Sequence, residues 1–501
     1  MNKLSRVSRN SLIVAFFFLI DKILAFVRAG IISRQFSNSV EMLDTFNAAN
    51  NLPDVLFALI SGGALAMAFI PLLSEYLTTK DRAAAWDLFS RVANVAFIVT
   101  GSIAVIIAIF AQPIVDAKLG IAPGFGLEQR TLLAELMRLN LIGTVIFSIS
   151  GLVMASLQAN QHFILPALAP TMYNLGQIFG AIFLVPRFGI QGLVYGVILG
   201  AAMHLLIQIP ALIKFGFRWT PSLDLRHTGL IEALRLMAPR LLTMAGIQII
   251  VLARDNLASR LDQVGAVTSL TYGWMIMQVP ETILGTAIAT ALLPTLSEYA
   301  ARGDWASFHL SIEKALRVLV SLTLPIAAVM AAGIHPLVRA VFGFDEPTTA
   351  LLTWTTRAYL FTLTGYTIHE IAARAFYARK EPMFPLYAVG IRVVMFLGIG
   401  IIAVTFFKKI GAPMLAFAEI ALLIEAIVLF GWLSGRTHER ITVGSAVLKG
   451  LIAALLGGVA TYSVAWIVPG SPILTALLGM AVGGILALTI VWSEARLLFR
   501  L

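Results

Sequence analysis

The sequence predicts an all-α, polytopic membrane protein built from two related halves, and three observations support this prediction. Of the 501 residues, 59% are hydrophobic and only 12% are charged, and the mean hydropathy is +0.90. A soluble core could not bury so much apolar surface. Apolar windows long enough to cross a bilayer run through nearly the whole chain. The segment PLLSEY at 71–76 returns as PTLSEY at 294–299, about 220 residues later, which indicates an internal duplication.

The apolar windows predict about fourteen membrane-spanning helices. In chain order they are 11–35, 43–73, 92–115, 131–157, 163–185, 189–213, 229–253, 264–296, 309–333, 350–373, 382–407, 411–434, 443–468 and 472–495. The longest polar link, near 214–229, has only about fifteen residues, so there is no room for a soluble catalytic domain. We therefore predict a transporter and not an enzyme. In duplicated carriers the substrate site usually lies between the halves, near mid-bilayer.

The distribution of basic residues predicts the orientation of the chain. If the N-terminus is cytoplasmic, the cytoplasmic links hold about twice as many Lys and Arg as the opposite links. We therefore expect both termini in the cytoplasm. The net charge of +10 reflects this bias and contact with anionic lipids, and it gives no reason to expect a nucleic acid partner. No cleavage site follows the first apolar stretch, so we expect a retained helix.

The first apolar window carries charges that are costly in a membrane. Asp21 and Arg28 are seven residues apart, so they share a helical face, and Lys22 widens this polar face. Each charge costs about 3 kcal/mol at the bilayer centre, so the helix should border a water-filled cavity or paired partners. We predict that Lys22 and Arg28 bind substrate. The alternative is an internal salt bridge of Asp21 with Arg28 or a neighbour.

The second window begins with polar residues and contains a proline. Asp44, Asn51 and Pro53 are candidates for the wall of a substrate cavity, with the helix broken at Pro53. The alternative is an ordinary helix start just outside the bilayer. The pair Gly62-Gly63 favours close helix packing over a phosphate loop, because no Lys or Ser/Thr follows in the required register.

The second half contains a similar set of candidates. Arg254 and Asp255 either line the cavity or pair with each other. Pro280, in the next window, is a candidate for gating. Pro166 begins a window after a polar turn, which fits a helix N-terminus as well as a function in gating.

A charged trio lies within the window 350–373 and its continuation. His369, Glu370 and Arg374 suit either a proton relay or a helix-locking pair of Glu370 with Arg374, and the separation of four residues favours the pair. The seven histidines are scattered without metal-ligand spacing, so we expect no metal site. No cofactor motif is present in the sequence.

Several blocks together resemble a known family. The run 44–54, DTFNAANNLPD, with 63–71, GALAMAFIP, and the preceding LAFVR at 24–28 resemble the signature of the MurJ/MviN family of lipid II flippases. Further matches are LPALAPT at 165–171, DNLAS at 255–259, QVP at 278–280, AIATALLP at 287–294 and RAFYA at 374–378. The resemblance covers essentially the whole chain, and its first block is specific.

The resemblance implies the architecture of the multidrug/oligosaccharidyl-lipid/polysaccharide (MOP) exporters, which include the multidrug exporters of the MATE type. That fold has two pseudo-symmetric six-helix bundles plus two C-terminal helices that form a lipid-tail groove. The corresponding domains are 1–213, a cytoplasmic linker at 214–228, 229–435, and the two extra helices at 436–501. The implied location is the bacterial cytoplasmic membrane.

The resemblance also implies the cargo and the site. The cargo is lipid II, an undecaprenyl diphosphate that carries the peptidoglycan precursor, moved to the outer leaflet by alternating access. Arg28 matches a cavity arginine of the family, Lys22 stands where an arginine is common, and Asp44 matches a family aspartate. No cofactor is implied, although Na⁺, H⁺ or the membrane potential could drive the cycle. Membrane lipids and cell-wall synthesis enzymes are the expected partners.

The chain departs from the family pattern at four positions. Phe57 and Met275 stand where well-known members have arginines, and Gly62 replaces an acidic residue. Arg254 or Arg260 could substitute for the lost cations. Glu381 stands where the family often has an Asp associated with cation coupling, and a charge in a cytoplasmic turn is the simpler interpretation. The rival functions are export of another polyprenyl-diphosphate glycan or of a cationic small molecule, and a transport-inactive scaffold.

Overall fold

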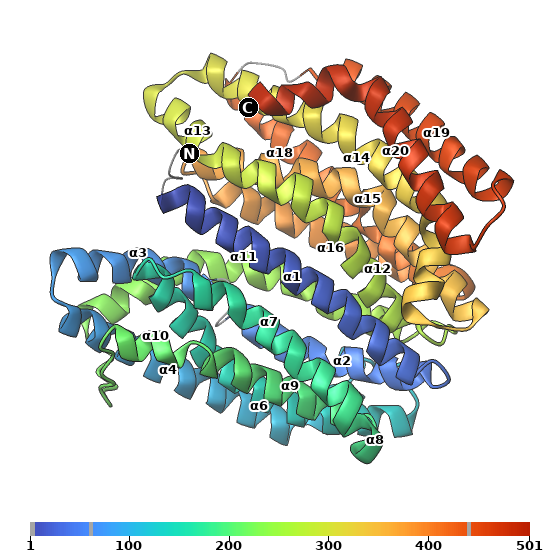
Figure 1. The fold of residues 1–501 in the computed structure, drawn as a ribbon. Coiled ribbons are helices and arrows are strands. Elements are labelled where there is room, and N and C mark those ends of the chain that lie inside the picture. The colour runs from blue at the N-terminus through green and yellow to red at the C-terminus, as the bar shows by residue number, and fades with distance from the viewer. Residues whose placement is uncertain (1–5, 60–63, 438–441, 501) are drawn as a thin grey trace. The chain divides into compact units, whose positions relative to one another are not determined.

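The computed structural model describes residues 6–59, 64–437 and 442–500, and this part of the chain is helical with no strand. The chain divides into two compact units, 1–256 and 257–501. The helices of the first unit, drawn from blue to green in Figure 1, are α1 (Arg6–Gln35), α2 (Val40–Phe57), α3 (Ala64–Thr79), α4 (Arg82–Ile109), α5 (Ala111–Asp116), α6 (Leu127–Ala159), α7 (Ile164–Phe179), η2 (Gly180–Leu184), α8 (Val185–Phe188), α9 (Gln191–Leu206), α10 (Ile209–Lys214) and α11 (Thr228–Ala258). The last of these, α11, ends just past the division.

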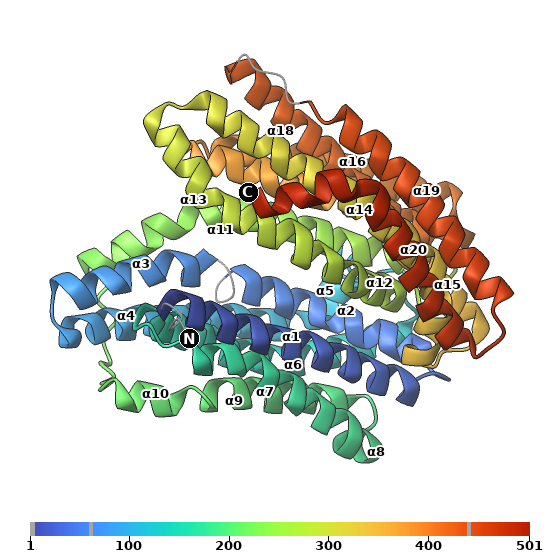
Figure 2. The same ribbon diagram turned by 45° about the horizontal axis from the view of Figure 1, so that its top comes forward.

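The second unit contains the remaining helices, coloured from green to red in Figures 1 and 2. They are α12 (Ala266–Glu281), η3 (Thr282–Thr286), α13 (Ala287–Arg302), α14 (Trp305–Phe342), α15 (Glu346–Ala378), α16 (Met383–Phe406), η4 (Lys408–Ile410), α17 (Gly411–Phe417), η5 (Ala418–Ile420), α18 (Ala421–Thr437), α19 (Gly444–Ile467), α20 (Pro472–Ala495) and η6 (Arg496–Arg500).

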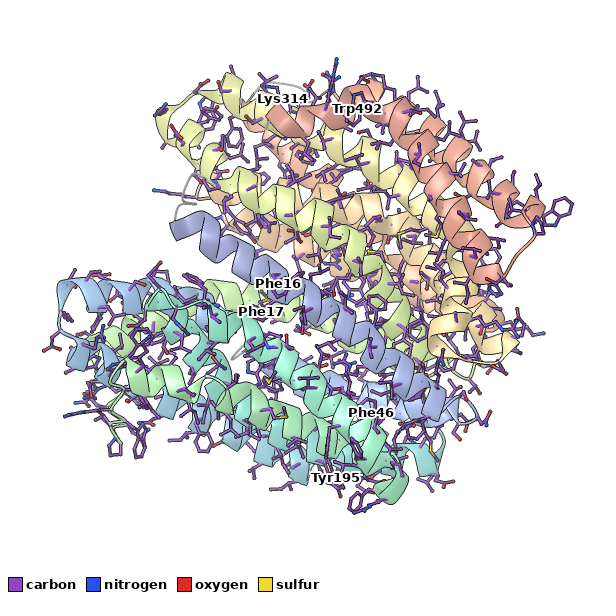
Figure 3. All side chains as sticks on the ribbon, viewed as in Figure 1. Phe16, Phe17, Phe46, Tyr195, Lys314 and Trp492 are labelled. Carbon is purple, nitrogen blue, oxygen red and sulfur yellow. The ribbon has the colours of Figure 1, made fainter. Side chains whose placement is uncertain are left out.

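The predicted membrane spans coincide with helices or with consecutive helical segments. Ten helical stretches of the described residues are long and apolar enough to cross a membrane. The other four windows lie on α1, on α2 with α3, on α11 and on α15. Residues 60–63 of the second window, which include the Gly62-Gly63 pair, lie outside the described residues. Large apolar side chains face outward, as helices in lipid require: Phe16 is 60% exposed and Trp492 is 53% exposed (Figure 3). The fold class predicted from the sequence is confirmed.

In the first unit, one apolar core joins α3 and α4 to the C-terminal part of α6 and to the start of α11. Leu73, Leu88 and Leu157 are fully buried in it, and Leu230 at the start of α11 packs against them. Elsewhere in this unit α7 and α9 approach closely through glycines. A Cβ at Gly176 would lie 2.3 Å from the Cα of Gly200, so only glycine permits this separation.

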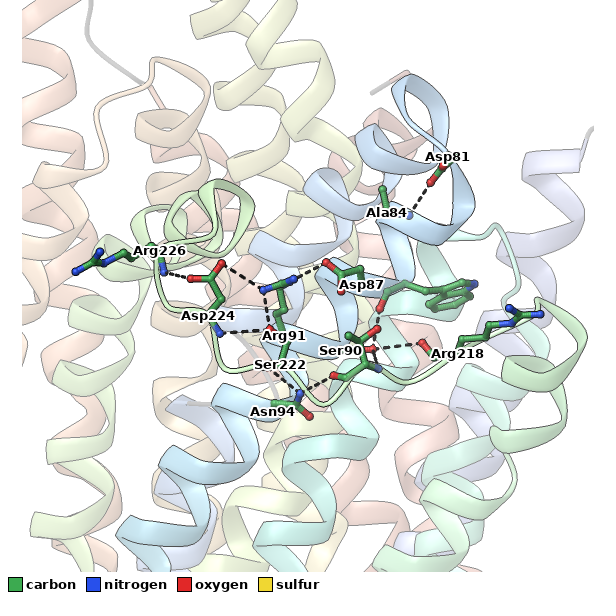
Figure 4. Close-up of polar contacts among 12 residues, drawn as sticks. Asp81, Ala84, Asp87, Ser90, Arg91, Asn94, Arg218, Ser222, Asp224 and Arg226 are labelled. Carbon is green, nitrogen blue, oxygen red and sulfur yellow. Dashed lines mark hydrogen bonds and ion pairs between the residues drawn. The ribbon is translucent and has the colours of Figure 1, made fainter.

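The segment between α10 and α11 is irregular and is fixed to α4 by hydrogen bonds (Figure 4). The Arg91 guanidinium donates to Ser222 Oγ at 2.8 Å and pairs with Asp87 on its own helix. Asn94 Nδ2 donates to the carbonyls of Thr220 and Ser222. The contacted segment lies within residues 214–228, which the sequence predicts to be a linker. The domain boundaries predicted from the sequence, 1–213, 214–228, 229–435 and 436–501, remain a prediction. The two compact units of the structure divide at another point, after Asn256.

In the second unit, the last two helices pack on α14. Glu494 of α20 is buried and accepts from Arg317 Nε of α14 at 2.9 Å and from Lys449 Nζ of α19 at 2.8 Å. Gly483 of α20 lies so close to α19 that a Cβ there would be 2.3 Å from the Gly457 carbonyl oxygen. One carboxylate and one close glycine contact therefore hold three helices together.

The repeated sequence motif folds in the same way in both units. Pro71 is the eighth residue of the 16-residue α3, and Pro294 is the eighth residue of the 16-residue α13. Leu73 and Leu296, two residues after each proline, are both fully buried. The aspartates that follow, Asp81 and Asp304, cap the next helices by accepting backbone N–H bonds from Ala84 at 2.6 Å and from Ser307 at 3.0 Å. The two copies of the motif thus form the same helix–turn–helix element.

Candidate substrate site

The polar face of α1 borders α7 within the first unit. Asp21 is the acceptor of a 2.7 Å hydrogen bond from Asn174 Nδ2 on α7. Lys22 and Arg28 are half-buried on α1, and Lys22 Nζ lies 5.2 Å from the centre of the Phe18 ring. In the alternative interpretation Asp21 pairs with Arg28 or a neighbour, whereas in the structure it accepts from the Asn174 amide on another helix.

A cavity of about 300 Å³ lies inside the first unit, between α2, α6, α7 and α9. Its lining combines an acid and two asparagines with aromatic rings: Asn50, Pro53, Asp54, Phe57, Asn140, Gly143, Thr144, Phe147, Met154, Pro170, Tyr173, Val197 and His204. Asp54 is exposed, although it lies in the interior of α2. The charge of Arg28 acts on both Asp54 and Tyr173, so this cation lies within electrostatic reach of the cavity wall.

The floor of this cavity is aromatic where the family resemblance would place an arginine. The Phe57 ring meets the Phe147 ring edge to face at 5.2 Å, and Phe147 contacts Tyr173 at 5.0 Å. Phe147 also lies 5.2 Å from the ring of His204, which bonds Ser150 Oγ at 2.6 Å. Phe57 thus replaces a charge by an apolar contact in the cavity. The sequence analysis did not single out Phe147, Tyr173 or His204, because aromatic residues are unremarkable in an apolar helix.

The predicted residues of α2 lie deep in the first unit. Asp44 is 4% exposed and Asn51 is 4% exposed. The helix begins at Val40, so Asn51 lies three turns inside it and not at a helix start. The predicted break at Pro53 is wrong, since α2 continues to Phe57. A proline removes one backbone donor, and here the packing of neighbouring helices keeps the chain helical around it.

Arg254 and Asp255 contact each other. Asp255 is 2% exposed and accepts from Arg254 Nε at 2.8 Å and from Asn51 Nδ2 at 2.8 Å. This geometry agrees with the second of the two interpretations, mutual pairing. The buried carboxylate engages the Arg254 guanidinium, and substitution of Arg254 for the cations absent at Phe57 and Met275 remains a prediction.

The residues predicted for gating lie in both units. Pro166 is buried in the first turn of α7, where a proline costs no helical hydrogen bond. Pro280 is buried near the end of α12, and the π-helical segment η3 follows it. Arg374 forms an ion pair with Glu370 one turn earlier on α15. Glu381 lies in the turn after α15, where the Arg379 guanidinium donates to it at 3.4 Å.

The second unit contains a charged cluster that the sequence analysis missed. His369 contacts Glu425 of α18, with 3.2 Å between Nε2 and Oε1, and does not join the expected trio with Glu370. Arg392 of α16 donates to Glu419 of η5 at 2.8 Å. Glu419, Glu425 and Arg392 all lie inside predicted apolar windows, so their charge in a membrane was the signal that could have revealed them.

Comparisons with known proteins identify the family. The family model described as "Lipid II flippase MurJ" matches residues 36–480. The chain belongs to the MurJ family. It is 28% identical over 398 residues to the lipid II flippase MurJ of Burkholderia cenocepacia, with 77% of this chain and 76% of the relative covered. It is 26% identical over 485 residues to the probable lipid II flippase MurJ of Vibrio cholerae, covering 92% and 91%.

Solved structures support the same fold. The structure titled "Lipid II flippase MurJ, inward closed conformation" superposes with a TM-score of 0.81 at 21% identity and covers 97% of this chain and 100% of its own. An inward-facing MATE multidrug transporter of the MOP superfamily gives a TM-score of 0.70 at 18% identity over 83% and 94%. These structures support the predicted MOP fold, and the MurJ family, to which the chain belongs, is a family of integral membrane transporters.

Proposed function

We propose that this MurJ-family chain moves lipid II from the inner to the outer leaflet of the bacterial cytoplasmic membrane by alternating access. The observation that carries the proposal is the position of Arg28, half-buried on α1 and within electrostatic reach of an exposed carboxylate, Asp54, at an internal cavity. A polyprenyl diphosphate needs a fixed cation near a wet cavity for its headgroup. Its tail needs an apolar surface open to lipid.

Charge balance suggests how the site handles the diphosphate. When the site is empty, Asp21 and Asp54 offset part of the charge of Lys22 and Arg28, and the site keeps a cationic character. An arriving diphosphate competes with Asp54 for Arg28. Asp44, Asn51 and Pro53 act in this proposal as the wall on α2 that keeps Asp54 in place. No bond in the cargo is broken, so the protein supplies binding and motion only.

The proposal includes an orientation of the chain in the membrane and a driving force for the transport cycle. Both termini lie in the cytoplasm, in agreement with the positive-inside distribution. The membrane potential can return a cationic site, since one charge crossing 100 mV is worth roughly 2.3 kcal/mol. Among the described residues, no group of three or more His, Asp or Glu side chains is arranged to hold a metal ion. Glu381 remains a candidate for coupling to a cation, and cell-wall synthesis enzymes remain candidate partners.

Transport of fluorescent lipid II in proteoliposomes tests the proposal. Vesicles that contain the purified protein should expose labelled lipid II to an external quencher faster than protein-free vesicles. Equal rates would refute the proposal. A competition series with another polyprenyl-diphosphate glycan and with a cationic dye distinguishes the rival cargoes.

Growth rescue of a flippase-depleted bacterium tests the remaining rival, a transport-inactive scaffold. A flippase should restore growth, and a scaffold should not. This rival has a structural basis at Phe57. The Phe57 ring packs against Phe147 in the cavity at a position where the family resemblance predicts an arginine, so one expected cation is absent.

A further inference from the structure

Five polar side chains form a buried cluster inside the second unit. Tyr366 and His369 come from α15, Arg392 from α16, Glu419 from η5 and Glu425 from α18. Glu419 and Glu425 are 7% and 0% exposed, and Arg392 is 7% exposed. Charged groups at such positions are costly and require either compensation or a function. We refer to these five residues as the unit 2 cluster.

One half of the unit 2 cluster is compensated. Arg392 Nη2 and Glu419 Oε2 are 2.8 Å apart, and both side chains are 8% exposed. The guanidinium also lies 6.0 Å from the centre of the Tyr366 ring. A buried pair with this geometry is electrically neutral and can serve a purely structural role.

The other half is not compensated. Within the described part of the chain, neither carboxylate oxygen of Glu425 accepts a hydrogen bond, and both oxygens are completely buried. The only ion-pair partner found for it there is His369, whose Nε2 lies 3.2 Å from Oε1. Burying a carboxylate without donors is strongly unfavourable. A bound positive species would remove this cost.

The charge count gives the size of the imbalance. Arg392 contributes one positive charge, the two glutamates contribute two negative charges, and a neutral His369 contributes none, so the unit 2 cluster carries one net negative charge. One proton restores neutrality. A metal ion is a poorer candidate, since no group of three or more His, Asp or Glu ligands is present in the described ranges.

A proton can reach the pair from one side. The His369 side chain is 18% exposed, whereas Glu425 is fully buried behind it. Of the charged groups nearby, Glu370 and Arg374 pair with each other on the next turn of α15. Glu281 of α12 faces them and is engaged by Thr282 and Thr286. From α14, Arg317 is held by Glu494. His369 is thus the titratable group placed between water and Glu425.

We propose that His369 and Glu425 bind one exchangeable proton within the second unit and that its uptake and release accompany the transport cycle. The proton enters on the imidazole of His369, whose Nε2 lies 3.2 Å from Oε1 of Glu425, and its uptake makes the unit 2 cluster neutral. Its loss restores the buried negative charge. Only the link to the transport cycle rests on the proposed function. The binding of the proton stands on the geometry of the pair.

Histidine-selective ¹⁵N NMR of the full-length protein in nanodiscs tests proton binding directly. The His369 signal is assigned from its loss in His369→Gln. We expect Glu425→Gln to lower the proton affinity of His369 by at least about tenfold, because an opposite charge within hydrogen-bond distance stabilises the imidazolium. An unchanged titration of His369, or a His369 that takes up no proton, would overturn the proposal.

The chain offers a matched control for this measurement. His335 and Glu346 form a similar pair, 3.3 Å between Nε2 and Oε1, but their side chains are 34% and 58% exposed. Glu346→Gln should change the proton affinity of His335 much less, because solvent screens the exposed pair. An equal change at both pairs would show that burial gives His369 no special role and would contradict the proposal. If Glu425→Gln does not fold, Glu425→Asp with its displaced carboxylate replaces it.

Proteoliposomes test the link to transport. A proton gradient should change the rate of lipid II flipping by the wild-type protein, His369→Gln and Glu425→Gln should remove this dependence, and His335→Gln should keep it. Wild-type flipping that ignores the gradient would refute coupling and leave the proposed function intact. Wild-type protein that flips no lipid II would refute the proposed function and, with it, coupling to flipping, while the NMR titration still decides whether the pair binds a proton.

Discussion

The two units share a repeated helix–turn–helix element but treat their interior charges differently. In the first unit, Arg28 and Asp54 are within electrostatic reach, and Asp54 is exposed at a cavity. In the second unit, Arg392 and Glu419 are in direct contact, and both are almost fully buried. The duplicated backbone therefore sets where the helices run, whereas a few side chains decide whether opposite charges in the interior face a cavity or contact each other directly.

The largest expected effect is on Arg28. Arg28→Ala should reduce lipid II flipping by roughly 10- to 100-fold, since a hydrogen bond to a charged group is worth about 1.5–3 kcal/mol. Arg34→Ala, an exposed arginine on the same helix, is the control and should stay within about twofold. Full activity of Arg28→Ala in proteoliposomes would remove the functional distinction between the two units.

The second prediction concerns the buried ion pair of Arg392 with Glu419. Arg392→Leu should lower the free energy of unfolding by about 3 kcal/mol, because it leaves Glu419 buried without its partner. The double variant Arg392→Leu/Glu419→Leu should recover most of this loss, as apolar residues often replace a buried pair without cost. Thermal unfolding in detergent measures both. A double variant as unstable as Arg392→Leu would show that the loss of stability does not come from the unpaired charge of Glu419.

The equivalent double replacement in the first unit sharpens the comparison. Arg28→Leu/Asp54→Leu should fold but should flip no better than Arg28→Ala, because charge at the cavity serves binding and not stability. Recovery of flipping in this double variant would contradict the proposed role of Arg28.

A third effect is expected at Asp255, a buried carboxylate of the first unit. Asp255→Ala leaves Arg254 and Asn51 without their shared acceptor and should cost about 2 kcal/mol of stability. Asp262→Ala, at an exposed position, is the control and should be close to neutral. Equal melting temperatures of the two variants would show that the hydrogen bonds of Arg254 and Asn51 to Asp255 do not stabilise the fold.

The smallest effects are expected at the two equivalent helix caps. Asp81→Ala should lower the melting temperature by about 2 °C, which corresponds to roughly 1 kcal/mol for a lost cap. Asp304→Ala should have a small effect of the same sign. Clearly different responses of the two variants at neutral pH would show that the repeats have diverged in stability.

The effect at Asp304 should also depend on pH. Hydrogen bonds from the side chain and the backbone of Ser307 hold the pKa of Asp304 below its ordinary value of 3.8. A carboxylate with a depressed folded-state pKa stabilises the fold above its unfolded pKa, and this contribution is lost as the pH falls through the folded value. The difference between the wild type and Asp304→Ala should therefore shrink in acid, which thermal scans at several pH values measure.

The sequence by itself determined the fold class, the helical windows and the duplication. Hydrophobic length and composition decide whether a segment can span a bilayer, and this information is local. The same is true of the repeated motif, because Pro71 and Pro294 occupy equivalent positions in their helices. The i, i+4 pair of Glu370 and Arg374 was also within reach of sequence analysis, since helical spacing alone places the two side chains together.

Only the tertiary structure decided which distant residues meet. Asn174 reaches Asp21 across 153 positions, and Asn51 reaches Asp255 across 204. His369 turns to Glu425 and not to its neighbour Glu370, because packing of α15 against α18 brings that carboxylate within 3.2 Å. A charge in an apolar window signals that a partner exists, but helix packing selects the partner, and no local pattern encodes that selection.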